Sequence, residues 1–159
     1  MDERKIAAYM FYLRMTNLFG NTCAEMKKLL RRQKLLGGKI SAHIDGLVAF
    51  AMELTLQTYL KPGVREEVLD RFLSWVLMAG ANDADYRAQL PAASGGNGAS
   101  DTPSDPALEY LMAGHVLLGQ CGKTDDRVTN DTIRQIGGEI FTMVCAITKR
   151  EVGSAGLDS

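Results

Sequence analysis

Residues 2–19 contain neither glycine nor proline, and their apolar side chains recur at the spacing of an α-helix. Two apolar stripes run along this predicted helix, and they comprise Ile6, Met10 and Leu13 on one side and Phe11, Met15 and Leu18 on the other. The helix is therefore predicted to be apolar around more than half of its circumference, which requires cover on two sides.

Glycine and proline divide the rest of the chain into further helical segments. Gly20-Asn21 is predicted to end the first helix, and a second helix then reaches Leu36, where Gly37-Gly38 stops it. The remaining predicted helices cover about residues 40–60, 64–79, 106–118 and 124–147. Thr124 is the expected cap of the last helix, and Gly137-Gly138 is expected to kink or break it.

No stretch alternates between apolar and polar residues as a β-strand does. The predicted fold class is all-α, a compact bundle of about six helices with a flexible Gly/Ser/Pro-rich loop. We expect one helical domain at residues 1–151, with the flexible loop at 91–105 and a disordered tail at 152–159.

The composition is typical of a globular protein: 46% of the 159 residues are hydrophobic and 23% are charged. No apolar run approaches the ~20 residues that cross a bilayer, and the pattern of a secretion signal is missing near Met1, so we expect a cytoplasmic protein without a membrane partner. Cys23, Cys121 and Cys145 are widely spaced among apolar neighbours, which is typical of reduced core cysteines rather than disulfides or zinc ligands.

Charge is distributed unevenly although the net charge is only −1. Residues 1–39 hold nine basic and three acidic residues, and the rest of the chain holds nine basic and sixteen acidic residues. On a helical wheel, most of the early basic residues share one face of the predicted second helix. The candidate binding residues are Lys27, Lys28, Arg31, Arg32, Lys34 and Lys39.

Three interpretations of this basic face remain open. The face contacts the phosphates of RNA or DNA without reading sequence, it docks an acidic protein surface, or it is solvated or paired with carboxylates of the same chain. We favour nucleic acid, because no acidic residue between Met26 and His43 is available to neutralise these charges within the helix.

No catalytic, cofactor or metal site is recognisable. Gly119-Gln120-Cys121-Gly122-Lys123-Thr124 ends like a phosphate-binding loop, but two residues instead of four separate its glycines and a predicted helix precedes it. We therefore expect no enzyme, no cofactor and no metal, and an enzyme without a recognisable motif is the remaining alternative.

The doubly apolar first helix suggests assembly with other chains. Its second stripe, Phe11, Met15 and Leu18, is the candidate interface for self-association or for docking into a larger assembly. The alternative is a central position in the protein's own bundle. Together these features predict a non-catalytic accessory or adaptor subunit, either a nucleic-acid binder or a protein–protein adaptor or regulator.

Overall fold

The computed structural model describes residues 2–32, 38–81, 84–89, 106–122 and 125–159. These residues form six helices and no strand, which confirms the all-α fold class. The helices are α1 (Glu3–Arg32), α2 (Gly38–Tyr59), α3 (Val64–Met78), α4 (Ala84–Gln89), α6 (Pro106–Cys121) and α7 (Arg127–Ser154). The predicted flexible loop at 91–105 lies outside the described residues.

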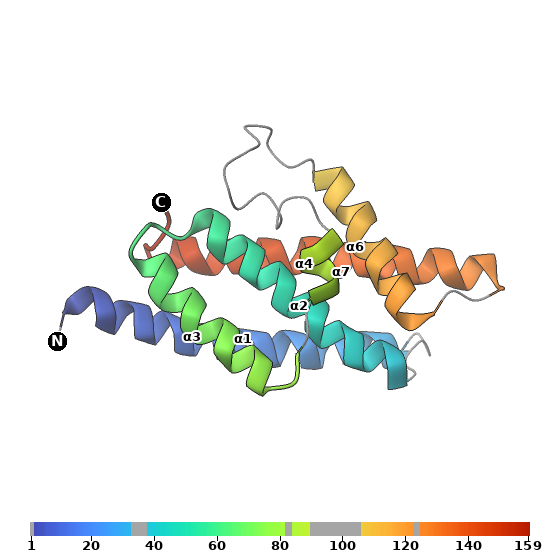
Figure 1. The fold of residues 1–159 in the computed structure, drawn as a ribbon, viewed down its shortest axis with the longest axis horizontal. Coiled ribbons are helices and arrows are strands. Elements are labelled where there is room, and N and C mark those ends of the chain that lie inside the picture. The colour runs from blue at the N-terminus through green and yellow to red at the C-terminus, as the bar shows by residue number, and fades with distance from the viewer. Residues whose placement is uncertain (1, 33–37, 82–83, 90–105, 123–124) are drawn as a thin grey trace.

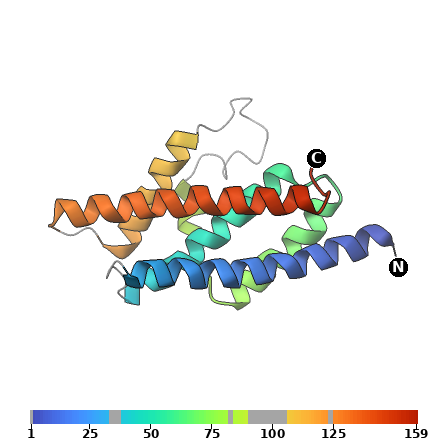
Figure 2. The same cartoon turned by 180° about the vertical axis from the view of Figure 1, so that it is seen from behind.

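The two longest helices, α1 and α7, lie side by side and run in opposite directions along the long axis of the molecule (Figure 2). In the opposite view, α2 crosses the centre of the molecule in front of α1 and α7, while α3 packs on α1 and α6 packs on α7 (Figure 1). None of the described helices is both long enough and apolar enough to cross a membrane.

The hydrophobic core surrounds α2, whose residues 46–56 are all buried. Phe50 stacks between Tyr86 of α4 and Phe141 of α7, with ring centroids 5.9 and 6.1 Å apart respectively. Phe19 of α1 contacts Phe72 of α3 edge to face, at 6.4 Å between centroids. Aromatic packing of this kind ties the short helix α4 and the long helix α7 to the central one, and α1 to α3.

The predicted break at Gly20-Asn21 is wrong, because α1 is one continuous helix of 30 residues. Its buried residues lie on a single stripe that passes Gly20 without a change of phase, and they include Ala8, Phe11, Met15, Phe19, Thr22, Cys23, Met26 and Leu30. A glycine inside a helix costs only about 1 kcal/mol relative to alanine. Packing of the continuous stripe outweighs that cost.

The predicted kink or break at Gly137-Gly138 is also wrong, because α7 continues through both glycines and runs straight along its length (Figure 2). The two residues instead let α6 approach closely. A Cβ atom on Gly137 would lie 2.8 Å from Cα of Gly114, and one on Gly138 would lie 2.7 Å from the ring of Tyr110. Gly114 on α6 is even more confined, since its Cβ would lie 2.1 Å from the backbone oxygen of Arg134. Helix α6 therefore crosses α7 through a contact that admits no side chain at these positions.

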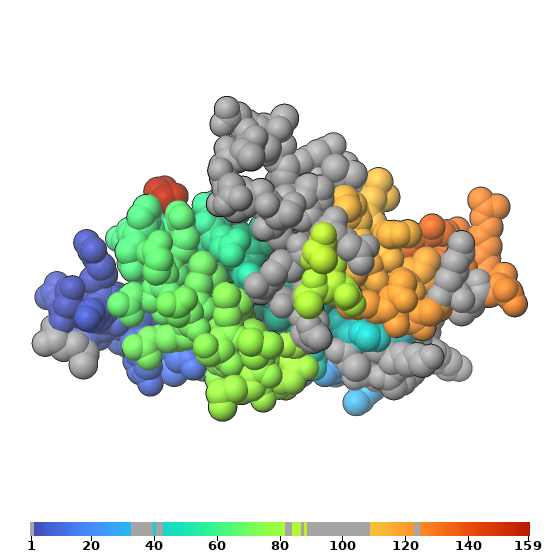
Figure 3. Space-filling view, viewed as in Figure 1, coloured from blue at the N-terminus to red at the C-terminus, as the bar shows by residue number. Residues whose placement is uncertain are grey.

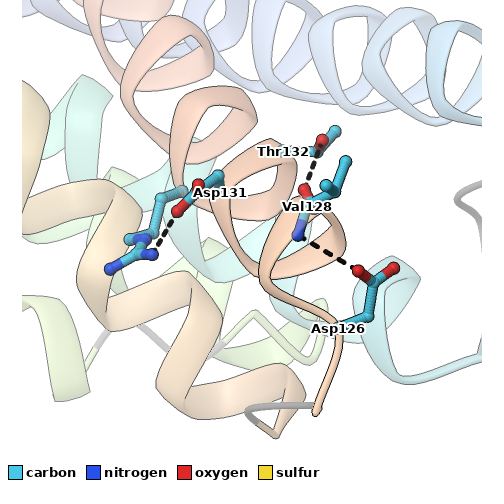
Figure 4. Close-up of polar contacts among 5 residues, drawn as sticks. Asp126, Val128, Asp131 and Thr132 are labelled. Atoms are coloured by element: carbon cyan, nitrogen blue, oxygen red, sulfur yellow. Dashed lines mark hydrogen bonds and ion pairs between the residues drawn. The ribbon is translucent and has the colours of Figure 1, made fainter.

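Asp126 caps the start of α7, whereas the predicted cap, Thr124, lies outside the described residues. The Asp126 carboxylate accepts a hydrogen bond from the backbone nitrogen of Val128 at 3.1 Å (Figure 4). It also accepts one from Thr129 Oγ1 at 2.5 Å. These two bonds hold the pKa of Asp126 below its ordinary value. One turn further on, Asp131 pairs with Arg134 on the outer face of the helix.

The structure differs from the predicted disordered tail at residues 152–159. Helix α7 extends to Ser154, and Leu157 is only 8% exposed. The backbone nitrogen of Lys61 donates to the oxygen of Leu157 at 2.9 Å, and Ser159 donates to Tyr59 at 2.9 Å. Burial of Leu157 and these backbone bonds order the end of the chain against the α2–α3 turn.

Candidate nucleic-acid interface

Three of the six predicted binding residues, Lys28, Arg31 and Arg32, form an exposed basic cluster in the last turns of α1. We call these three residues the basic end of α1. The opposite side of the same turns carries Met26 and Leu30, which are 6% and 3% exposed and anchor the helix in the core. Burial of that apolar side directs the three cations away from the protein.

No carboxylate among the described residues lies within ion-pair distance of Lys28, Arg31 or Arg32. Glu25, one turn before Lys28, is exposed and pairs with none of them. The described residues therefore do not neutralise these three cations through ion pairs.

Lys27 differs from its neighbours, because its ammonium group pairs with Asp45 of α2 at 2.8 Å. Both side chains are about one-quarter exposed, at 26% and 29%. Asp45 also faces Cys23, and burial together with this carboxylate raises the pKa of the Cys23 thiol far above its ordinary value. Lys27 thus joins α1 to α2, which removes it from the set of free cations.

The last two predicted residues are not placed in detail. Lys34 lies outside the described residues. Lys39 lies in the first turn of α2, and its side chain is not described.

An apolar groove adjoins the basic end, on the side where α1 faces α7. It has a volume of about 70 Å³ and is lined by Met26, Leu29, Leu30, Ile136, Glu139, Ile140 and Met143. Leu29 and Met143 remain 43% and 41% exposed at its mouth. The sequence pattern did not predict this groove, because its two walls lie more than 100 residues apart in the chain.

The predicted protein interface on the first helix is wrong for two of its three members, which are buried in the core. Phe11 is 2% exposed and Met15 is 0% exposed, and Leu18 is half-buried against the core. The alternative, a position inside the protein's own bundle, is what the structure shows. The exposed side of α1 carries the other stripe, Ile6, Met10 and Leu13.

No family model, curated protein sequence or solved structure matches this chain. Functional inference therefore rests on the side chains themselves.

The described residues contain no cluster of three or more His, Cys, Asp or Glu side chains that could hold a metal ion. Cys145 and Cys23 are free thiols, and burial raises the pKa of Cys145 to about 11, which keeps it protonated at neutral pH. His115 is exposed on α6, and Lys123 of the loop-like motif lies outside the described residues. The basic end of α1 is the part of the predicted site that the structure places together on the surface.

Proposed function

We propose that this chain is a non-catalytic accessory or adaptor subunit of a cytoplasmic assembly, and that the basic end of α1 binds the sugar-phosphate backbone of RNA or DNA. The observation that carries the proposal is the exposure of Lys28, Arg31 and Arg32 together, with no carboxylate of the described chain beside them. Three such cations within two helical turns can neutralise three phosphates and release their counterions.

The physical cost of holding these charges together is small. Lys28 repels Arg31 and Arg32 at helical spacings of three and four, by a few tenths of a kcal/mol for each pair. The negative end of the α1 dipole offsets this repulsion, since a cation in the last turn gains about 0.3–1 kcal/mol. The cluster is therefore stable without a ligand, and an anionic polymer meets charges that are already in place.

Base stacking is not expected at the basic end. No aromatic side chain of the described residues lies in the last three turns of α1, so base stacking does not contribute there. The expected binding is independent of sequence and depends on charge alone.

A second candidate is an acidic, amphipathic segment of a partner protein. The exposed Leu29 and Met143 at the mouth of the apolar groove favour it, because a peptide can place apolar side chains there and nucleic acid cannot. Glu139 in the same groove opposes it, because this carboxylate repels an acidic segment.

The proposal is tested by titrating fluorescently labelled oligonucleotides of mixed sequence with the protein at several salt concentrations. Three phosphate contacts predict that log K falls with log salt at a slope of about −2.7 for duplex DNA and about −2.1 for single strands. The affinity for duplex then drops by about 40-fold between about 50 and about 200 mM salt.

Two results would contradict the proposal. One is the absence of binding at the lowest salt concentration. The other is binding that salt does not weaken, which would mean that phosphates are not the contact. Tight binding of a labelled acidic amphipathic peptide in place of the oligonucleotides would favour the second candidate.

A further inference from the structure

The outward face of α1 carries a second feature that nucleic-acid binding does not use. Ile6, Met10 and Leu13 are 41%, 62% and 42% exposed, and they lie on the side opposite to the buried stripe of the same helix. We call these three residues the outer stripe. The first turns of α1 project beyond α3 at one end of the molecule (Figure 3).

Scattered apolar residues are normal on a protein surface, but these three lie together. Their spacing of four and three residues places them in one line over two turns of helix. Tyr9, 46% exposed, borders the line, and Arg71 of α3 lies over its ring at 5.2 Å from the centroid. The result is a narrow apolar ridge rather than an isolated contact.

The outer stripe is close to symmetric about Met10. Ile6 lies four residues before Met10 and Leu13 lies three residues after it. If a second copy of α1 packs in the opposite direction with Met10 on the two-fold axis, Ile6 of each copy meets Leu13 of the other. Every exposed apolar residue of the stripe then faces another apolar residue. We propose that two copies of this chain associate in this way, through an antiparallel pair of α1 helices centred near Met10.

Charges beside the stripe support this occupant and this direction. Glu3 and Arg14 are eleven residues apart, which is close to three full turns, so they lie on the same flank of the stripe. In an antiparallel pair, a given flank of one helix faces the same flank of the other helix. Glu3 of one copy therefore lies beside Arg14 of the other. In a parallel pair this flank would instead face the opposite flank of the second copy, and Glu3 would not meet Arg14.

Arg14 can pair with Glu151 of its own chain and with Glu3 of the second copy at the same time. Its side chain is 52% exposed, and one terminal nitrogen already donates to Glu151 of the same chain at 2.6 Å. A guanidinium group has five N–H donors in all, so further donors remain for Glu3 of the second copy. The bond to Glu151 fixes the position of Arg14 before the second copy arrives.

The proposed contact leaves the basic end of α1 accessible. Lys28 lies eighteen residues beyond Met10, about 27 Å along the helix axis. The α1 helix of the second copy extends toward Lys28 only as far as its own start at Glu3, about 11 Å from the axis. The two proposals therefore fail or succeed separately.

Sedimentation velocity over a series of protein concentrations tests the association. The wild-type chain is expected to shift from monomer to dimer as concentration rises into the millimolar range. Met10→Glu places two carboxylates face to face on the two-fold axis, so it is expected to raise the dissociation constant by more than about tenfold. Leu111→Glu is the matched control, because Leu111 is equally apolar, 65% exposed, and lies on α6. It is expected to leave the dimer unchanged.

Oxidative cross-linking tests the direction of the pair independently of the effect of Met10→Glu. Met10→Cys is expected to form an intermolecular disulfide, because residue 10 of each copy lies near the axis. Asn17→Cys, on the same exposed face, is expected to form no intermolecular disulfide. Residue 17 lies seven residues from the axis on each copy, so the two thiols are about 21 Å apart, too far for a disulfide.

Four outcomes would overturn the proposal. A wild-type chain that remains monomeric at every concentration excludes the pair, as does a monomer that binds lipid vesicles through the outer stripe. A dimer that Met10→Glu does not weaken places the contact elsewhere. Equal cross-linking at positions 10 and 17 indicates parallel helices instead.

Discussion

Replacing Lys28, Arg31 and Arg32 together by Glu is expected to weaken binding to duplex DNA by at least about 100-fold at low salt, because three phosphate contacts become three repulsions. The remaining affinity should show almost no dependence on salt. The measurement is the oligonucleotide titration, with wild-type and variant proteins compared at each salt concentration. All three side chains are exposed and form no ion pair with the described residues, so the fold and its thermal unfolding should change little.

A matched variant separates a local contact from the effect of net charge. Three further exposed cations are Lys5 in the first turn of α1, Lys61 in the turn between α2 and α3, and Arg150 near the end of α7. These segments lie at the opposite end of the molecule from the last turns of α1 (Figure 1). Their joint replacement by Glu changes the net charge by the same amount. At physiological salt, charges beyond about 8 Å are largely screened, so we expect this control to weaken binding by about threefold or less. If both variants lost the same amount of affinity for the oligonucleotide, that result would contradict a binding site at the end of α1.

Gly114→Ala is expected to lower the free energy of unfolding by about 3 kcal/mol, the largest effect of any alanine substitution at a glycine of the described residues. The added Cβ would lie 2.1 Å from the backbone oxygen of Arg134. A backbone atom cannot turn aside as a flexible side chain can, so α6 and α7 must separate along their whole crossing. Denaturant unfolding followed by circular dichroism measures this loss.

Gly119→Ala is the control for that experiment. Gly119 lies on the same helix, and a Cβ there would meet nothing within 4 Å. Because alanine favours a helix over glycine, we expect Gly119→Ala to stabilise the protein by up to about 1 kcal/mol. If both substitutions have the same effect, the close crossing of α6 and α7 is not what Gly114 provides.

The sequence predicts most helices because glycine and proline mark their ends. Pro62 and Gly63 separate α2 from α3 as expected, and α6 begins at Pro106. The errors arise where a glycine lies inside a helix. Gly20 was predicted to end one, but the buried residues on both sides of Gly20 follow a single stripe. A periodicity that continues across a glycine was the available signal, and it outweighs the glycine's modest cost.

The prediction at Gly137 and Gly138 is wrong for a different reason. Their role depends on which helix packs against α7, and the partner residue Gly114 is more than 20 positions away. Local sequence shows that two glycines lie in a helical segment. It does not show whether they bend that helix or admit a neighbour.

The candidate interface could be predicted only as a set of charges. The wheel separates Lys28, Arg31 and Arg32 from the apolar side of α1, and the structure places them on the surface. The helical wheel cannot show that Lys27 pairs with Asp45, because that contact depends on how α2 packs on α1. The helical wheel also cannot show which of the two apolar stripes is buried. Both have helical spacing, and only the position of α3 and α2 decides that Phe11 is buried and Met10 exposed.

The most direct test of the central claim is a map of the bound surface by nuclear magnetic resonance. Isotope-labelled protein is titrated with an unlabelled oligonucleotide, and backbone amide and arginine side-chain signals are followed. Binding by the basic end predicts that the largest shifts occur at Lys28, Arg31 and Arg32 and disappear when salt is added, while Lys61 and Arg150 are unaffected. Shifts centred on any other surface, or no shift at an oligonucleotide excess, would contradict the claim.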